Sequence, residues 1–228
     1  MFYNFDYLIY MLPAIALMLF AQWRVKAAYA KWSKVRNRYG LTGADAARRL
    51  LDAAGLGDVR LDRAPGELSD NYDPRGNVLR LSPSVASTPS VAALAIAAHE
   101  IGHALQDRDG YAPLRFRSAI VPAVNIGAYL GWILILIGLA INLTGLAWLG
   151  VAVFSGGALF AFVTLPVEFD ASARARRLLA STGLVTAEEQ NGVNSVLNAA
   201  ALTYVAGLAT AIMQVLYYVT LIGGRRRR

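Results

Sequence analysis

Two histidines four residues apart, His99 and His103, enclose a glutamate in the segment His-Glu-Ile-Gly-His. In a helix, this spacing places both imidazoles on one face, where both can bind the same Zn²⁺ ion. Glu100 directly follows the first histidine and can act as a general base toward a water molecule at that metal. The chain contains two histidines in all, and both belong to this motif. The spacing therefore predicts a catalytic zinc helix rather than two unrelated core histidines.

The third zinc ligand must be a carboxylate. A catalytic zinc has three protein ligands and one open position, and the chain has neither a cysteine nor a third histidine. The carboxylates considered are Asp107, Asp109, Glu168, Asp170, Glu188 and Glu189. We predict Glu168 as the ligand because it directly follows an apolar segment, with Asp170 as its supporting partner or as an alternative ligand. Glu188 and Glu189 follow Thr186 and are typical of the first turn of a helix.

The helix that carries the motif is expected to be buried. Thr88 and Pro89 are typical of a helix start, with Thr88 as the N-cap and Pro89 in the first helical position. Every residue from Val91 to Ala98 is apolar, which predicts burial on nearly all sides. Two imidazoles and a carboxylate inside such a helix are costly without a metal ion. Gly102 leaves space beside the helix for close packing or for substrate.

A small antiparallel sheet is expected before this helix. Residues 58–61 and 77–81 alternate polar and apolar side chains, as half-buried strands do. Asp70, Tyr72 and Asp73 are interpreted as part of the intervening turn, with a functional polar role as the alternative. An edge strand beside a zinc helix can pair with an extended peptide through backbone hydrogen bonds, and we assign that role to residues 77–81. The expected substrate-binding residues are Asn77, Val78 and Leu79.

Apolar segments account for much of the chain. Of its 228 residues, 56% are hydrophobic and 16% are charged, and the mean hydropathy is +0.42. This composition is too apolar for a soluble domain and too charged for a protein that lies wholly within a membrane. Four segments are long enough to span a bilayer, namely residues 5–23, 118–141, 145–165 and 199–223. Three residues separate the second from the third, which predicts a tight hairpin.

The net charge of +7 reflects basic residues that lie beside these apolar segments. Membrane topology explains this distribution better than binding to nucleic acid does. Six lysines and arginines lie between Arg24 and Arg38, directly after the first span, and the positive-inside rule places them in the cytoplasm. Four spans would then place the C-terminus outside, whereas the basic run Arg225–Arg228 favours the inside. An interfacial or re-entrant final helix is the alternative.

These features predict a mainly α, polytopic membrane protein with about four transmembrane helices and a small α+β, zincin-like cytoplasmic domain. Its expected parts are residues 1–23 as the N-terminal anchor, 24–117 as the zincin-like domain, 118–165 as the transmembrane hairpin, 166–198 as the helix with the third ligand, and 199–228 as the C-terminal transmembrane helix with a basic tail. Tyr204, near the start of that last helix, can donate a hydrogen bond to the oxyanion of a tetrahedral intermediate. A tyrosine at the membrane interface is the simpler interpretation.

A set of stretches along the whole chain forms a recognisable pattern, namely residues 42–44, 47–51, 65–68, 72–74, 97–104, 111–114, 165–172 and 197–206. Together they resemble the bacterial YugP-like family of membrane zinc metallopeptidases. That family is similar to the HtpX and CAAX-prenyl-protease type of membrane peptidase, in which a Glu-x-x-x-Asp segment after a transmembrane hairpin supplies the third zinc ligand. The resemblance implies that Glu168 is this glutamate. Ser172 stands where those relatives have the aspartate.

The motif and the resemblance together predict a zinc-dependent endopeptidase in the bacterial inner membrane, with its active site facing the cytoplasm. Its expected partners are a membrane-associated or misfolded polypeptide as substrate and the lipid bilayer, with no nucleic acid. The alternative is a scaffold or chaperone-like adaptor with a structural zinc, in which Asp170 or another carboxylate closes the fourth position. A transporter is disfavoured because the spans contain almost no charged residues.

Overall fold

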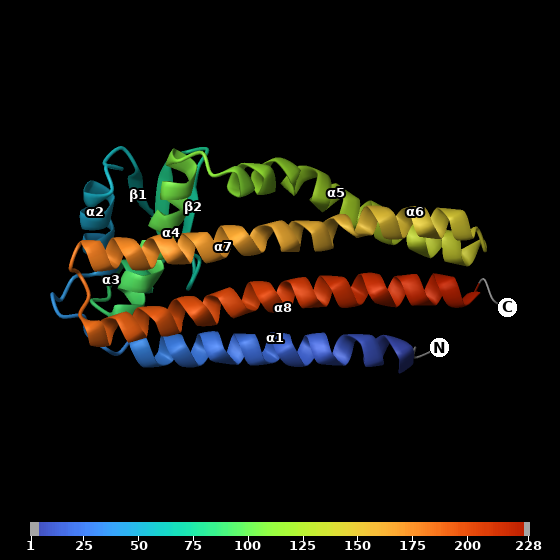
Figure 1. Ribbon diagram of the computed structural model, residues 1–228, viewed down its shortest axis with the longest axis horizontal. Coiled ribbons are helices and arrows are strands. Elements are labelled where there is room, and N and C mark those ends of the chain that lie inside the picture. The colour runs from blue at the N-terminus through green and yellow to red at the C-terminus, as the bar shows by residue number, and fades with distance from the viewer. Residues whose placement is uncertain (1–4, 226–228) are drawn as a thin grey trace. The chain divides into compact units, whose positions relative to one another are not determined.

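The computed structural model describes residues 5–225 and is mainly helical, with one small sheet (Figure 1). The helices are α1 (Phe5–Trp32), α2 (Gly43–Ala53), α3 (Pro83–Ser87), α4 (Val91–Arg108), α5 (Ala112–Ala140), α6 (Thr144–Phe154), α7 (Gly156–Ser181) and α8 (Ala187–Arg225). Four helical segments are long and apolar enough to cross a membrane: Tyr7–Trp32, Ala112–Ala140, Thr144–Ser181 and Ala187–Gly224. The predicted fold class, mainly α with about four spans, is confirmed. Residues 226–228 of the predicted basic tail lie outside the described residues.

The chain divides into two compact units. We call the first the motif unit, made of Gln22–Leu114 and Val167–Leu202. The second, the apolar unit, is made of Met1–Ala21, Arg115–Pro166 and Thr203–Arg228. The motif unit is therefore built from two separate stretches of sequence.

The core of the motif unit is centred on α4, which packs against α2 and against the sheet (Figure 1). Leu94 and Ile101 of α4 are completely buried, as are Leu50 of α2 and Leu179 of α7. The predicted N-cap of this helix is wrong. Thr88 instead ends α3, and the hydroxyl of Ser90 accepts a hydrogen bond from the backbone N–H of Ala93 to cap α4. Thr88 is the C-cap of the short helix α3, which the sequence did not predict.

The sheet has three strands in the order β1-β3-β2, with β1 at Arg60–Arg63, β2 at Asn71–Asp73 and β3 at Val78–Leu81. β1 pairs with β3 in parallel, and β2 pairs with β3 in antiparallel orientation. The predicted antiparallel pairing of the first and last strands is therefore wrong. The segment interpreted as a turn contains β2, and this extra strand reverses the chain direction between β1 and β3.

The apolar unit contains the α5–α6 hairpin. A Cβ atom at Gly138 would lie 2.4 Å from the backbone nitrogen of Ala147, so the two helices approach closely where a glycine leaves room. Ile135 and Ala147 are completely buried between helices, whereas many large apolar side chains of α5 are exposed. Exposed apolar surface of this kind is what a helix that faces lipid presents.

Candidate metal centre

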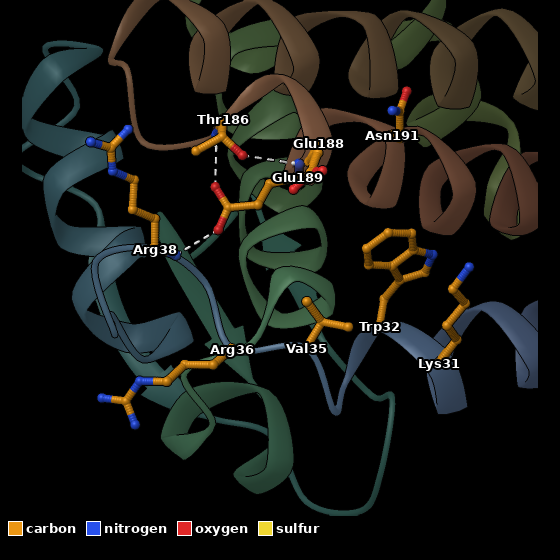
Figure 2. A pocket seen from close by; sticks show the side chains of 9 residues that line it. All are labelled: Lys31, Trp32, Val35, Arg36, Arg38, Thr186, Glu188, Glu189 and Asn191. Carbon is orange, nitrogen blue, oxygen red and sulfur yellow. Dashed lines mark hydrogen bonds between the residues drawn. The ribbon is translucent and has the colours of Figure 1, made fainter.

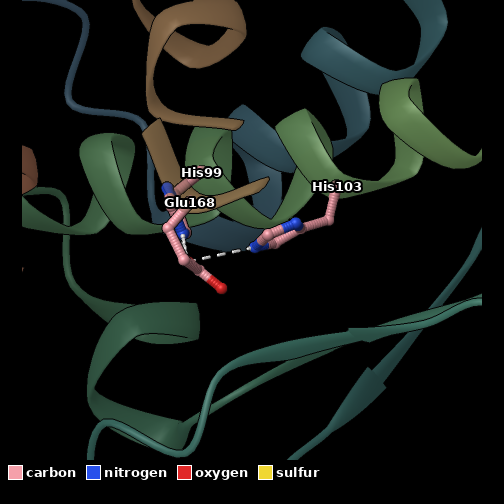
Figure 3. Close-up of side chains that lie close together, drawn as sticks. All are labelled: His99, His103 and Glu168. Atoms are coloured by element: carbon pink, nitrogen blue, oxygen red, sulfur yellow. Dashed lines mark hydrogen bonds and ion pairs between the residues drawn. The ribbon is translucent and has the colours of Figure 1, made fainter. Parts of the chain in front are cut away.

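The side chains of His99, His103 and Glu168 converge, two from α4 and one from α7 (Figure 3). One ligand atom from each residue lies within 4.8 Å of the others. The Nε2 atom of His99 is 3.3 Å from Oε2 of Glu168, and the Nε2 atom of His103 is 3.6 Å from the same oxygen. Glu168 is 2% exposed, so its carboxylate lies buried against the two imidazoles.

These donors fit zinc in type and in spacing. Two imidazole nitrogens and one carboxylate oxygen are the ligand set of many catalytic zinc sites. Bonds of about 2.0–2.1 Å at tetrahedral angles separate neighbouring ligand atoms by about 3.4 Å. The two distances from Glu168 Oε2, 3.3 and 3.6 Å, are close to that value. Across residues 5–225, no further histidine or carboxylate joins this group, so these side chains would supply three ligands to a metal.

Gly102 allows α4 and α7 to come this close. A Cβ atom at residue 102 would lie 2.3 Å from the carbonyl oxygen of Ala171 and 2.9 Å from its carbonyl carbon. Such distances leave no room for any side chain. Of the two roles predicted for Gly102, the structure shows close packing, and this packing brings Glu168 within reach of the histidines.

Each imidazole also contacts a polar group through its Nδ1 atom. The hydroxyl of Ser172 lies 3.2 Å from Nδ1 of His99. The amide oxygen Oε1 of Gln106 lies 3.0 Å from Nδ1 of His103. Burial lowers the pKa of His103, but the nearby carboxylates of Glu168 and Glu100 and the contact with Gln106 together outweigh this effect, and the net pKa lies above the ordinary histidine value.

Asp170 lies outside the group of three donors. Its Oδ2 atom accepts hydrogen bonds from Nε2 of Gln106 at 2.9 Å and from Nε of Arg174 at 2.6 Å. Asp170 thus touches a partner of His103, which agrees with the supporting role and not with direct ligation. Sequence reasoning missed Gln106, although its position three residues after His103 places it on the same face of α4.

The carboxylate of Glu100 is held by the sheet. Its Oε2 atom accepts a hydrogen bond of 3.0 Å from the backbone N–H of Tyr72 in β2. Burial raises the pKa of Glu100 above the ordinary glutamate value, and the neighbouring histidines oppose this shift only in part. The hydroxyl of Tyr72 donates to Asp107 of α4, so β2 is fixed beside the motif at two points. The general-base candidate therefore faces the backbone of an edge strand.

The predicted substrate-binding edge is wrong. β3 is the central strand and has partners on both sides, so its backbone groups cannot pair with a peptide. Val78 and Leu79 are buried, at 5% and 0% exposure. The Asn77 amide is engaged by Asp58 and by the hydroxyl of Tyr72. The alternation of the sequence correctly indicated a strand but not its place in the sheet.

Three of the four remaining candidate carboxylates have other partners. Asp107 accepts from Tyr72, and Asp109 pairs with Arg108 and Arg174. At the start of α8, the carboxylate of Glu189 accepts from the backbone N–H of Thr186 and of Arg38, and the Thr186 hydroxyl accepts from Glu189 N–H (Figure 2). This is a capping box, and it agrees with the prediction that Glu188 and Glu189 lie in the first turn of a helix.

Figure 2 also shows a hollow lined by Lys31, Trp32 and these capping residues, and the side chains of Arg36 and Arg38 point away from Trp32. The hollow does not belong to the metal centre. Tyr204 lies in α8 in the apolar unit, and its role in catalysis stays a prediction.

Comparison with known proteins supports zinc as the metal for such a site. The chain belongs to the family described as "Putative neutral zinc metallopeptidase", whose profile matches residues 7–223. A relative, described as "Putative membrane protease YugP" of Bacillus subtilis (strain 168), is 42% identical over 215 residues, which cover 94% of this chain and 96% of the relative. No solved structure matches the chain. The predicted resemblance to the YugP-like family is confirmed.

Proposed function

We propose that this protein is a membrane-embedded, zinc-dependent endopeptidase that hydrolyses membrane-associated or misfolded proteins at the cytoplasmic face of the bacterial inner membrane. The observation that carries the proposal is the convergence of His99, His103 and Glu168, with the carboxylate of Glu100 directly after the first histidine. Membership of a zinc metallopeptidase family and four candidate spans support the same conclusion.

Each residue of the site has a role in this proposal. His99, His103 and Glu168 would hold the zinc ion through two imidazole nitrogens and one carboxylate oxygen. When bound, zinc supplies Lewis-acid polarisation of a carbonyl group and lowers the pKa of water. Glu100 takes a proton from the attacking water onto its carboxylate and later gives it to the nitrogen of the leaving amine. The raised pKa of Glu100 suits this exchange, because a base that titrates nearer to neutral pH both accepts and releases a proton readily.

We propose that an extended segment of the substrate pairs with β2 rather than with β3. β2 is an edge strand, and the backbone N–H of Tyr72 points away from the sheet toward Glu100. A peptide added at this edge through backbone hydrogen bonds would lie beside the general base.

Tyr204 stays the proposed hydrogen-bond donor to the oxyanion. Its test is the Tyr204→Phe variant, which should lose kcat and still bind zinc.

The orientation of the site follows from the positive-inside rule. The basic residues between Arg24 and Arg38 belong to the motif unit and predict that it lies in the cytoplasm. A topology reporter fused after Gly224 should then give an external signal. A cytoplasmic signal at that position would refute a simple fourth span and favour the re-entrant alternative.

The test of the enzyme is the Glu100→Gln variant of the full-length protein. Wild type and variant should both bind one zinc ion, and only wild type should cleave a denatured protein substrate. Proteomics of membrane fractions should show uncut proteins accumulating in the variant. Wild-type protein without stoichiometric zinc, or unchanged proteolysis by Glu100→Gln, contradicts the proposal. A crystal structure with four protein ligands on the metal would favour the adaptor with a structural zinc.

A further inference from the structure

Gln106 of α4 is completely buried, and its partners fix the orientation of its amide group. The Nε2 atom donates to the backbone carbonyl of Val167 at 2.8 Å and to Oδ2 of Asp170 at 2.9 Å. A backbone carbonyl can only accept a hydrogen bond, and an ionised carboxylate likewise only accepts. The NH₂ group must therefore lie on this side of the amide. The oxygen Oε1 lies on the other side, 3.0 Å from Nδ1 of His103.

This orientation determines which nitrogen of His103 carries the proton. An amide oxygen can only accept, so Nδ1 of His103 must be the donor. In the neutral imidazole the lone pair then resides on Nε2, the atom that lies 3.6 Å from Oε2 of Glu168. We propose that Gln106 is a positioning residue that holds His103 in the Nδ1–H form and thereby presents Nε2 to the metal. This inference rests on the proposed function, because it assumes a metal between these side chains.

An ion-pair network keeps the amide in place. Asp170 accepts from Arg174 as well as from Gln106, and Arg174 also pairs with Asp109 at the end of α4. The network therefore connects α4 and α7 on the side of His103 that faces away from Glu168. It gives Asp170 a role without direct contact with the metal.

His99 provides an internal comparison. Its Nδ1 atom contacts the hydroxyl of Ser172 at 3.2 Å. A hydroxyl can donate or accept, so this contact by itself imposes neither form of the imidazole. Gln106, by contrast, permits one form of His103. Loss of the Gln106 amide should therefore change the tautomer of His103 and leave that of His99 unchanged.

The tautomer can be measured directly because the chain has two histidines. Full-length protein labelled with ¹⁵N-histidine, metal-free, in detergent micelles and at a pH where both imidazoles are neutral, is studied by long-range ¹H–¹⁵N correlation. A His99→Asn variant assigns the two spectra. We expect wild-type His103 to be protonated on Nδ1, and Gln106→Leu to show protonation on Nε2 or a mixture. The same variant should bind Zn²⁺ about 10- to 100-fold more weakly in competition with a chromophoric chelator.

Gln190→Leu is the matched control. Gln190 is a partly buried glutamine of α8 in the motif unit, and its amide nitrogen bonds to Asn194 rather than to a histidine. This variant should keep the wild-type tautomer and the wild-type affinity for Zn²⁺. If Gln106→Leu fails to fold, the tautomer of wild-type His103 still tests the inference, because that measurement needs no variant.

Two results would overturn the inference. One is wild-type His103 protonated on Nε2, a result that needs no variant. The other is a Gln106→Leu protein in which His103 keeps the Nδ1–H form. Any loss of zinc affinity would then show only that Gln106 helps to hold α4 against α7. Neither measurement requires proteolysis. A protein that shows the expected tautomers but cleaves no substrate would overturn the proposed enzyme and leave this role of Gln106 intact.

Discussion

Replacement of Gly102 by alanine should force α4 and α7 apart. The added Cβ atom would lie 2.3 Å from the carbonyl oxygen of Ala171 and 2.9 Å from its carbonyl carbon. A carbon and an oxygen in close contact are about 3.3 Å apart, so the helices must separate by about 1 Å. Because the atoms in the way are backbone atoms of a helix, no change of side-chain rotamer can relieve the overlap.

The separation acts on the metal centre through α7. Glu168 lies three residues before Ala171, and Ser172, the partner of His99, follows it directly. Overpacking of this kind costs about 1–3 kcal/mol. The three ligands can reach one metal only if the two helices return to their wild-type separation. The metal-bound form of the variant therefore bears the overpacking cost, and metal binding becomes less favourable by up to that amount. A loss of 1–3 kcal/mol corresponds to an affinity about 5- to 150-fold weaker.

The assay is a competition between the purified full-length protein and a chromophoric chelator for Zn²⁺. Gly157→Ala is the control, because Gly157 also lies in α7 but no atom lies within 4 Å of the position of its added Cβ. Gly157→Ala should bind zinc like wild type, and Gly102→Ala should bind 5- to 150-fold more weakly. Wild-type affinity in Gly102→Ala would refute the reasoning that Gly102 sets the distance between the histidines and Glu168.

Three further outcomes are expected. Ser172→Ala removes the hydroxyl 3.2 Å from Nδ1 of His99 and should weaken zinc binding by about tenfold in the same competition assay, whereas a serine that only fills space would leave the affinity unchanged. Because burial raises the pKa of Glu100 and the base is the ionised form, kcat/KM should fall as the pH drops through that raised pKa, so an acid limb at or below the ordinary glutamate value of about 4.3 would contradict the assignment. Gly138→Ala should lower the temperature of thermal aggregation in detergent, because its Cβ would lie 2.4 Å from a backbone nitrogen of α6, while Gly145→Ala, with no atom within 4 Å, should melt like wild type.

The parts of the site that depend on local sequence could be predicted. The spacing of His99 and His103 requires a helix for both imidazoles to share a face, and α4 has that form. Elimination of other ligand types left a carboxylate, and the apolar segment before Glu168 pointed to the residue that the structure brings next to both histidines. These inferences need only periodicity, composition and the ligand chemistry of zinc.

The sheet shows where such reasoning ends. Alternation along a strand reports which side chains face the core, but it does not report the direction or the identity of the neighbouring strand. β2 is three residues long and includes Asp73, a residue type that is common in turns. Asn71 and Asp73 have little strand propensity of their own, so β2 forms a strand because it pairs with β3. Because β2 pairs with β3, β3 is the central strand, and β2 with Tyr72 forms an edge of the sheet.

The partners of the histidines could not be predicted for a similar reason. Gln106 reaches Val167 and Asp170, which lie more than 60 positions later in the sequence. Ser172 reaches His99 across 73 positions. Contacts of this kind depend on how α7 packs on α4, which Gly102 permits but does not by itself specify.

The motif unit is made of two stretches of sequence, and both contribute to the candidate metal centre. Gln22–Leu114 contains both histidines and Glu100, whereas Val167–Leu202 contains Glu168 and buries Leu179 in the core around α4. A fragment that ended before the membrane hairpin would lack one metal ligand and also part of the apolar core. Glu168 belongs to a helical segment, Thr144–Ser181, that is itself a candidate span. The segment that follows the hairpin, Val167–Leu202, therefore completes both the candidate metal centre and the core that supports it.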